Sequence, residues 1–281
     1  MILYTCAELS DFIAHQKLQG QTIGFVPTMG ALHQGHLGLA TQAMEECTLV
    51  VVSIFVNPTQ FNKAEDLVNY PRTLEADTEL IHQLNPDILV FAPTAADLYG
   101  AQIQAKSYDF GPMATTMEGE FRPGHFDGVG TVVNLLLRAV SPDKAYFGEK
   151  DYQQLKIVEQ LVAIEKLPVA IVPCPIARNA QGLALSSRNA RLTAAQRRQA
   201  TVVYKMLKKA QDCFEVQDIP AIQEMVKKAF DHEPQMTLEY FAIAPVDTLM
   251  PARSKIEKTS YRAFIAVIVS GVRLIDNMQL N

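Results

Sequence analysis

A block of ten residues, PTMGALHQGH at positions 27–36, constrains the fold of this chain more than any other feature. It follows a short apolar run, residues 22–26, and precedes an amphipathic stretch, residues 37–47. This order predicts a strand, a tight turn and the start of a helix. Such a turn directs backbone N–H groups and the positive end of a helix dipole at an anion. His33 and His36 lie at the helix start and can both donate to phosphate oxygens.

Short β-branched runs alternate with helical patterns through the first two-thirds of the chain, which predicts a parallel sheet with right-handed crossovers. The expected strands are 22–26, 49–56, 88–91, 144–147 and 169–173. The expected helices are 37–47, 74–84, 129–139 and 153–165. Polar clusters at 27–36, 57–61 and 148–151 follow strands, where ligands of such sheets bind. We therefore expect an α/β fold with a Rossmann-like, doubly wound parallel sheet over residues 1–176, which would bind the substrates.

The pattern changes after about residue 175. A polar loop is followed by Thr193 and Gln196, a capping box that opens one long helix to about residue 213. The other expected elements are a helix at 219–232 and strands at 237–244, 262–269 and 272–276. Helices followed by strands predict a separate, smaller α+β domain, residues 177–281. We expect this domain to close over the active site.

The composition suits a soluble globular protein, with 48% hydrophobic and 20% charged residues among 281. The net charge of −5 argues against a nucleic-acid partner. The longest apolar runs are too short for a bilayer and the N-terminus lacks a basic signal start, so we expect a cytoplasmic protein without a membrane partner. The four cysteines form no CxxC pair, which predicts free thiols.

Two further segments suit phosphate. Lys150 follows an expected strand and is a compact positive charge for phosphate oxygens. Asp151 beside it can accept hydrogen bonds from ribose hydroxyls or cap the next helix. Residues 186–189, Ser-Ser-Arg-Asn, combine two hydroxyls, a guanidinium and an amide, a set that suits a polyphosphate or a carboxylate.

Amide side chains offer a place for a smaller substrate. Asn57 and Gln60 end a buried strand and suit a hydroxyl or carboxylate group, although they also suit a plain turn. Of Gln153 and Gln154, neighbours on one helix, one should face the ligand and the other should not. Residues 118–130 hold four glycines and form either a mobile flap or the approach to a helix.

These sequence blocks together resemble those of the pantothenate synthetases (pantoate–β-alanine ligases). This family belongs to the superfamily of HIGH-type nucleotidyltransferases and class I aminoacyl-tRNA synthetases. The matching blocks are PTMGALHQGH, FVNPTQF, YPRT, RPGHFDGV, YFGEKDYQQL and LALSSRN, and RLIDN at 273–277 also fits. The resemblance implies an ATP-dependent ligase that joins (R)-pantoate to β-alanine through a pantoyl adenylate and releases AMP and diphosphate. It also implies a homodimer, with Mg²⁺ brought by ATP.

The resemblance further implies site roles. The catalytic set would be His33, His36, Lys150 and Arg188. The other ATP-binding residues would be Met29, Gly30, Gly35, Gly148, Glu149, Asp151, Ala177, Leu185, Ser186 and Ser187, with the backbone of Ala177 at the adenine. Pantoate would contact Met29, Gln60 and Gln154, and β-alanine would lie along Asn57, Gln60 and Tyr70. Leu185 replaces a common Met. Ala76 precedes Asp77 where some members carry two acids, so no protein ligand for the metal is assigned.

Other function classes stay open from the residues alone. A nucleotidyltransferase that moves AMP or CMP onto a phosphorylated precursor also uses the HxGH pattern, although FVNPTQF and the C-terminal domain favour the ligase. A tRNA synthetase would need an anticodon-binding region and a less acidic surface. A nucleotide-binding regulator without turnover would not need the amides at 57–60. The lid that excludes water from the adenylate would be either residues 118–130 or the loop of Ser186.

Overall fold

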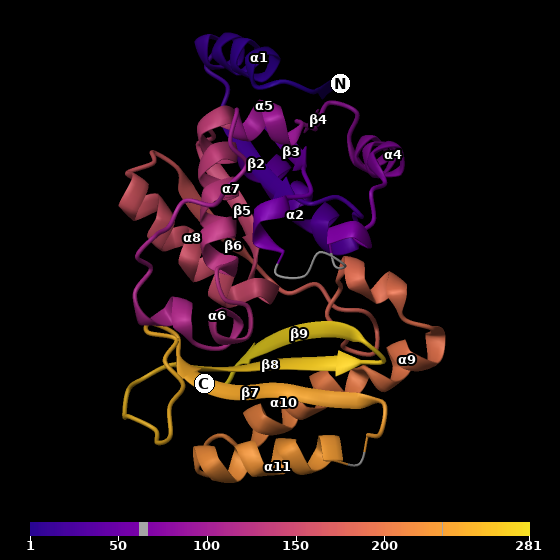
Figure 1. Ribbon diagram of the computed structural model, residues 1–281, viewed down its shortest axis with the longest axis vertical. Helices are drawn as coiled ribbons and strands as arrows, with labels where there is room; N and C mark the ends of the chain where they lie inside the picture. The colour runs from indigo at the N-terminus through magenta and orange to yellow at the C-terminus, as the bar shows by residue number, and fades with distance from the viewer. Residues whose placement is uncertain (62–66, 232) are drawn as a thin grey trace. The chain divides into compact units, whose positions relative to one another are not determined.

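The computed structural model describes residues 1–61, 67–231 and 233–281 and divides into two compact units (Figure 1). The first comprises Met1–Phe110, Arg122–Glu149 and Gln154–Pro175. The second comprises Gly111–Phe121, Lys150–Gln153 and Ile176–Asn281. Two short pieces from the first two-thirds of the chain thus fold with the C-terminal residues, so the units interleave along the sequence. The closure of the C-terminal domain over the active site stays a prediction.

A wholly parallel sheet of six strands, in the order β1-β4-β3-β2-β5-β6, forms the centre of the first unit. The strands are β1 (Ile2–Leu3), β2 (Ile23–Thr28), β3 (Leu49–Ile54), β4 (Leu89–Phe91), β5 (Lys144–Gly148) and β6 (Ala170–Cys174). The predicted Rossmann-like fold is confirmed. The strand order reverses between the paired strands β2 and β5, and sheets of this kind bind ligands beyond the carboxyl ends at that switch point.

Both faces of this sheet are covered by helices. The helices with residues in the first unit are α1 (Cys6–Leu18), α2 (Gln34–Glu46), α4 (Leu74–Leu84), α5 (Ala95–Tyr99), α7 (His125–Val140) and α8 (Tyr152–Glu165). One face packs Val26, Val52 and Val90 against Ala43 of α2 and Ile81 of α4. The alternate strand residues are equally buried, because α7 and α8 lie on the other face (Figure 1).

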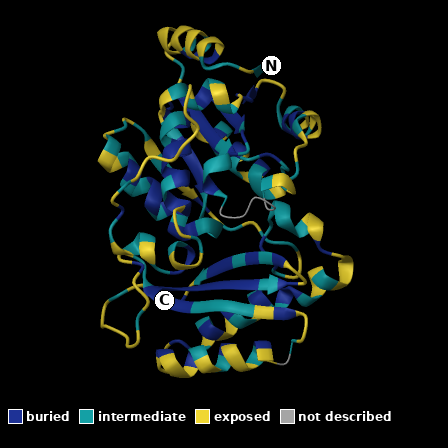
Figure 2. Ribbon diagram, viewed as in Figure 1, coloured by how far each residue is buried: buried dark blue, intermediate teal, exposed yellow. Residues whose placement is uncertain are grey.

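The second unit is an antiparallel sheet packed on two helices. Its strands β7 (Met236–Pro245), β8 (Tyr261–Val269) and β9 (Val272–Gln279) pair in chain order. Its helices are α6 (Glu118–Phe121), α9 (Ala194–Gln199), α10 (Thr201–Cys213) and α11 (Ile219–Asp231). Figure 2 shows the strands largely buried and much of α11 exposed, as expected for a sheet whose core lies against amphipathic helices. The last residue of the predicted helix 219–232, His232, lies outside the described residues.

The single helix predicted from residue 193 to 213 is wrong, because the helix breaks at Ala200. The predicted capping box is present: the Thr193 side chain accepts from the Gln196 N–H, and the Gln196 side chain accepts from the Thr193 N–H. Beyond it, the Thr201 hydroxyl donates to the Arg198 carbonyl at 2.7 Å. A hydroxyl that bonds back to the preceding turn competes with the helical ladder and bends it. The result is two helices, α9 and α10.

Residues 118–130 contain helical segments, which favours the helix-approach interpretation over the mobile flap. Within the second unit, Glu118 of α6 is 7% exposed. It receives both terminal nitrogens of the Arg273 guanidinium, at 2.8 and 2.7 Å, and the Tyr240 hydroxyl at 2.8 Å. Arg273 also pairs with Glu239. Burial and the neighbouring Glu118 raise the pKa of Tyr240 well above its usual value, so this phenol stays a donor.

Among the described helices, none has both the length and the apolar character to cross a membrane.

Candidate active site

The two histidines of the 27–36 block form a reciprocal cap at the start of α2. The His33 imidazole accepts the Gly35 N–H at Nδ1 (3.1 Å), and the His36 imidazole accepts the His33 N–H at Nδ1 (3.3 Å). The two rings stack with their centroids 4.1 Å apart. Because an Nδ1 that accepts a hydrogen bond carries no proton, both neutral rings hold their hydrogen on Nε2. Both histidines are therefore Nε2–H donors, and the cap explains why α2 begins at residue 34 and not 37.

Most backbone N–H groups of this turn bond to acceptors within the protein, and a role for them as anion ligands stays a prediction. The Gly30 N–H bonds to the Thr28 hydroxyl, and the His36 and Leu37 N–H groups bond to the His33 carbonyl. The carboxylate of Asp77, described below, accepts two more of these N–H groups. The residues whose N–H groups bond to acceptors within the protein are therefore Gly30, Ala31, Leu32, His33, Gly35, His36 and Leu37. The positive end of the α2 dipole lies at this turn, and the two neutral imidazoles add their Nε2–H donors.

Asp77, which lies on α4, holds the glycine turn in place. Its carboxylate oxygens accept the N–H groups of Ala31 (2.8 Å) and Leu32 (2.7 Å), and Thr73 donates to it as well. Gly30 has φ +80°, and a Cβ there would lie 3.0 Å from Asp77 Oδ2. Asp77 is 3% exposed. Both of its oxygens accept from the turn, so this side chain holds residues 31–32 in position.

Asn57 and Gln60 lie together at the end of β3, on a short 3₁₀ turn, η1 (Pro58–Gln60). Asn57 is 1% exposed; its amide donates to Gln60 Oε1 and the Gly128 carbonyl, and its oxygen accepts from Thr59 and Tyr99. These bonds use the hydrogen-bonding capacity of Asn57. Gln60 directs its Nε2 to Met29 Sδ at 2.9 Å, a weak acceptor that a substrate oxygen could replace. A contact of β-alanine with Asn57 stays a prediction.

The start of α7 fixes this turn from behind. The His125 imidazole, 4% exposed, has Nδ1 3.0 Å from the Gln60 carbonyl and Nε2 3.0 Å from a guanidinium nitrogen of Arg122. Since a carbonyl only accepts and a guanidinium only donates, His125 is the neutral Nδ1–H tautomer. Gly128 permits the close approach: a Cβ there would lie 2.4 Å from the Thr59 carbonyl oxygen. Neither His125 nor Gly128 was assigned a role by the sequence, although both lie in its RPGHFDGV block.

The other predicted site residues of the first unit lie near the carboxyl ends of the strands of the parallel sheet. Tyr70 meets Phe61 edge-on, with ring centroids 5.7 Å apart, which brings it to the 57–61 segment. Gly148 ends β5, and Glu149 follows it. Gln154 is partly exposed on α8, whereas Gln153 is 3% exposed and, in the second unit, binds the backbone of residues 113–118. The expectation that only one of the two glutamines is available to a ligand therefore points to Gln154.

In the second unit, the Lys150 ammonium lies 3.6 Å from Asp151 and is 18% exposed. The loop of residues 177–189 folds back on itself: the Leu185 N–H bonds to the carbonyl of Ala177, and an isolated bridge joins Arg178 and Ala184. Ser186 caps η4 (Ser187–Arg191) by accepting the Arg188 N–H at 3.3 Å. The serines and Arg188 are partly exposed, as a ligand-binding loop requires.

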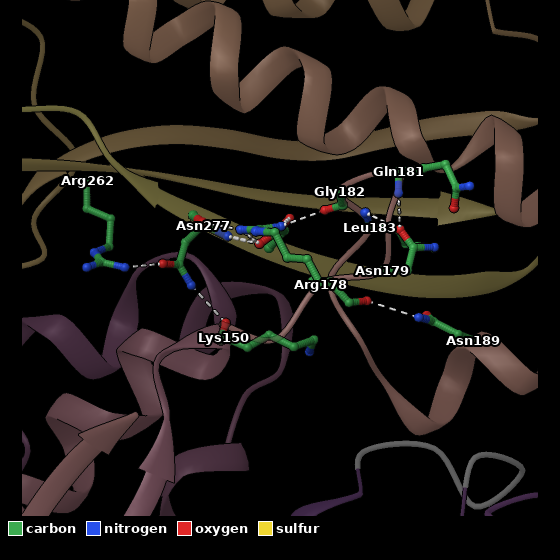
Figure 3. Close-up of polar contacts among 11 residues, drawn as sticks. Lys150, Arg178, Asn179, Gln181, Gly182, Leu183, Asn189, Arg262 and Asn277 are labelled. Atoms are coloured by element: carbon green, nitrogen blue, oxygen red, sulfur yellow. Dashed lines mark hydrogen bonds and ion pairs between the residues drawn. The ribbon is translucent and has the colours of Figure 1, made fainter. Parts of the chain in front are cut away.

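This loop is tied to strand β9 by residues that the sequence left without a role (Figure 3). Arg178 binds both oxygens of Asp276, at 2.5 and 2.9 Å, and donates to the Gly182 carbonyl. Burial raises the pKa of the Asp276 carboxyl, and the Arg178 guanidinium acts in the opposite direction. Asn277, 1% exposed, donates from Nδ2 to the Lys150 carbonyl at 2.8 Å. The described residues contain no group of three His, Cys, Asp or Glu side chains that could hold a metal ion.

Comparison with known proteins shows which proteins this chain is similar to. Residues 1–279 match the family model described as pantoate-beta-alanine ligase. A pantothenate synthetase from Christiangramia forsetii is 49% identical over 97% of this chain and 96% of that protein. The crystal structure of pantothenate synthetase from Thermus thermophilus superposes with a TM-score of 0.90 at 38% identity, over 99% of both chains.

A structure of pantoate-beta-alanine ligase from Francisella tularensis has a TM-score of 0.83 at 34% identity, and covers 100% of this chain and 97% of that one. That protein was solved in complex with beta-gamma ATP and beta-alanine. The similarity extends over the whole length of each of these proteins, so it includes both units of this chain.

Proposed function

Because the chain belongs to the pantoate–β-alanine ligase family, whose reaction is the ATP-dependent condensation of pantoate with β-alanine, we propose which of its residues carry each step. The observation that supports the assignment best is the reciprocal histidine cap. It leaves His33 and His36 with Nε2–H as their donor position, at the positive end of a 13-residue helix. Such an array suits the negative charge that grows on phosphate oxygens during displacement at phosphorus.

Each unit by itself contains residues that are proposed to bind ATP. From the first come the two histidines with Met29, Gly30, Gly35, Gly148 and Glu149. From the second come Lys150, Asp151, Ala177, Leu185, Ser186, Ser187 and Arg188. Lys150 and Arg188 supply positive charge, the serine hydroxyls donate to phosphate, Asp151 accepts from the ribose, and the backbone near Ala177 meets the base. His33, His36, Lys150 and Arg188 are the members that act on the reacting phosphates.

The two smaller substrates are assigned to the amides. Met29, Gln60 and Gln154 would hold pantoate, and Gln60 and Tyr70 would lie along the path of β-alanine. The buried Asn57 supports this set by fixing the Gln60 side chain through a 3.0 Å hydrogen bond. A direct contact between Asn57 and β-alanine would require one of its present bonds to open. The amides are neutral donors and acceptors, which suits a hydroxy acid whose carboxylate must stay nucleophilic.

The reaction proceeds in two transfers. A pantoate carboxylate oxygen attacks the α-phosphorus of ATP in line, and the bond to the bridging oxygen breaks as diphosphate leaves. The uncharged amine of β-alanine then attacks the acyl carbon of the adenylate, loses a proton, and displaces AMP. No residue forms a covalent bond, so the protein contributes positioning and charge stabilisation. Exclusion of water protects the adenylate.

Membership of the family also supports proposals about the metal ion, the cellular location and partners, and the oligomeric state. Mg²⁺ would arrive with ATP and be held by phosphate oxygens and water, since Asp77 is occupied by the turn 31–32. The enzyme would be cytoplasmic, and its partners would be its substrates rather than nucleic acid. It would be a homodimer, which the molar mass in solution tests: about twice the 31.1 kDa of the chain is expected, and 31.1 kDa at assay concentrations contradicts it.

The histidine assignment is tested by substitutions that separate capping from donation. Asn is a good N-cap, so His33→Asn keeps an acceptor for the Gly35 N–H while it lacks the Nε2–H donor. We expect pantoate-dependent exchange of diphosphate into ATP to fall about 10²–10³-fold with the melting temperature retained. His36→Ala and Lys150→Ala should each lose a similar factor.

Lys144→Ala is the matched control, because Lys144 lies on the preceding strand and pairs with an exposed glutamate, Glu46. It should keep wild-type exchange. Near-normal exchange in His33→Asn, His36→Ala or Lys150→Ala would remove that residue from the catalytic set.

A further inference from the structure

Two consecutive residues of β9, Asp276 and Asn277, are buried polar side chains with exposures of 4% and 1%. Neighbouring residues on a strand direct their side chains to opposite faces of the sheet. These two adjacent side chains of β9 therefore contact two different segments of the second unit. The partners of the two side chains show which segments these are (Figure 3).

Asn277 holds the segment that carries Lys150. Its Nδ2 donates to the Lys150 carbonyl at 2.8 Å, and its Oδ1 accepts from Arg262 at 2.5 Å. The Arg262 guanidinium also stacks on the Tyr152 ring, 3.9 Å from its centroid. The turn before α8 is thus fixed at its backbone by one amide, and that amide is itself held by a stacked guanidinium.

Asp276 holds the loop that carries Ser186 and Arg188. It binds Arg178 through two parallel hydrogen bonds, and Arg178 reaches the Gly182 carbonyl and the Asn277 carbonyl. The two side chains are also linked, because the Asn277 N–H donates to Asp276 Oδ1 at 2.8 Å. Bidentate pairs of this kind fix orientation as well as distance.

The two segments meet at a small cavity beside β9. Its volume is about 10 Å³, and its polar lining comes from Lys150, Ser186, Asn189 and Asp276. A space of this size holds about one water molecule. Because β9 is bonded to both segments that line this cavity, the strand sets the spacing of Lys150 from the Ser186 loop.

We propose that Asp276 and Asn277 are positioning residues that hold Lys150 and the Ser186–Arg188 loop in register for the phosphates of ATP. The inference rests on the roles assigned to Lys150 and the loop under the proposed function. Neither Asp276 nor Asn277 touches substrate; each acts through the segment that it binds. A displacement of a catalytic group by about 1 Å can cost about 10²-fold in rate, so a missing bond at this point changes turnover.

The test is Asn277→Asp in the purified full-length enzyme. This change keeps the acceptor for Arg262 and replaces the donor to the Lys150 carbonyl with an oxygen. Gln279→Ala is the matched control, because Gln279 accepts from Arg262 at 3.2 Å on the same strand but does not bind Lys150. We expect Asn277→Asp to lower the turnover of pantoate-dependent exchange roughly 10- to 100-fold with an unchanged KM for pantoate, and Gln279→Ala to stay near wild type.

A double-mutant cycle separates positioning from a general structural defect. In a Lys150→Ala background, Asn277→Asp should cause no further loss, because the group that it positions is gone. Wild-type exchange in Asn277→Asp, or losses that multiply in the double mutant, would overturn the proposal and leave the role of Lys150 intact. Wild-type exchange in Lys150→Ala would instead overturn the role of Lys150 and the positioning with it.

If Asn277→Asp does not fold, Asn277→Ser is measured in the same way. If neither variant folds, the pair is an element of stability and the proposal is overturned.

Discussion

Replacing Gly128 by alanine should move α7 away from the turn that carries Gln60. The added Cβ would lie 2.4 Å from the Thr59 carbonyl oxygen and 2.7 Å from Gln60 Cα. Both atoms belong to the backbone, so neither can turn aside. To reach ordinary contact at 3.4 Å, the helix and the turn must separate by about 1.0 Å along the shorter of these vectors.

Two effects follow from a separation of this size. The Gly128 carbonyl accepts from Asn57, and Asn57 fixes Gln60, so the amide that is proposed to bind pantoate is displaced with the turn. A shift of about 1 Å corresponds to a loss of up to about 10²-fold in kcat/KM for pantoate. Stability should fall by roughly 0.5–2 kcal/mol, since overpacking costs about 1–3 kcal/mol and the helix gains about 0.5–1 kcal/mol from Ala in place of Gly.

Gly130→Ala is the matched control on the same helix. Its Cβ would meet the ring of Phe110 at 2.9 Å and that of Tyr108 at 3.1 Å, which are side chains away from the 57–61 turn. It should cost a comparable amount of stability and leave the pantoate kinetics unchanged. The assay is diphosphate exchange as a function of pantoate at saturating ATP, with unfolding by urea measured in parallel. Wild-type pantoate kinetics in Gly128→Ala, or an equal loss in Gly130→Ala, would refute the account of how Gln60 is held.

Arg273→Met should destabilise the protein by about 3–5 kcal/mol, because it leaves the buried Glu118 and the partly buried Glu239 without their cation. Arg138→Met breaks an exposed pair and should cost at most about 1 kcal/mol. Urea unfolding measures both losses, and equal losses would contradict the role of the cluster. Burial, with nearby acidic charges, raises the pKa of Cys174 from 9.0 to about 11. The raised pKa stabilises the fold below pH 9, and this contribution is lost as the pH rises toward 11. Cys174→Ala should therefore flatten the fall of unfolding free energy above pH 9, and an unchanged slope would refute the shift.

The parts of the fold that could be predicted are those with a strong period and clear ends. The apolar run at 49–52 lies in β3, whose residues are buried on both faces, and α4 begins and ends where its pattern predicts, Leu74–Leu84. Helix α1 (Cys6–Leu18) was missed because Leu9 and Ile13 are its only buried residues, so it shows almost no apolar face. The signal that could have found it is its capping box, in which Thr5 and Glu8 bond to each other's backbone N–H.

Motifs indicated the side chains that are proposed to bind the ligands, but not the groups that hold those side chains in place. The acceptor for Ala31 lies 46 residues away at Asp77, and the donor to the Lys150 carbonyl lies 127 residues away at Asn277. No local spacing encodes such pairs, because they depend on which elements the sheet brings together. The same holds for the N–H groups of residues 30–37, because their internal acceptors could not be read from the sequence.

The central claim is that this chain activates pantoate as an acyl adenylate. The most direct measurement is exchange of labelled diphosphate into ATP by the purified wild-type enzyme, with pantoate and β-alanine added separately. The account predicts exchange that requires pantoate, proceeds without β-alanine, and gives way to amide product and AMP when β-alanine is added. Exchange without pantoate would point to a different nucleotidyl acceptor. The absence of exchange with pantoate, or a need for β-alanine before any exchange occurs, would contradict the adenylate mechanism.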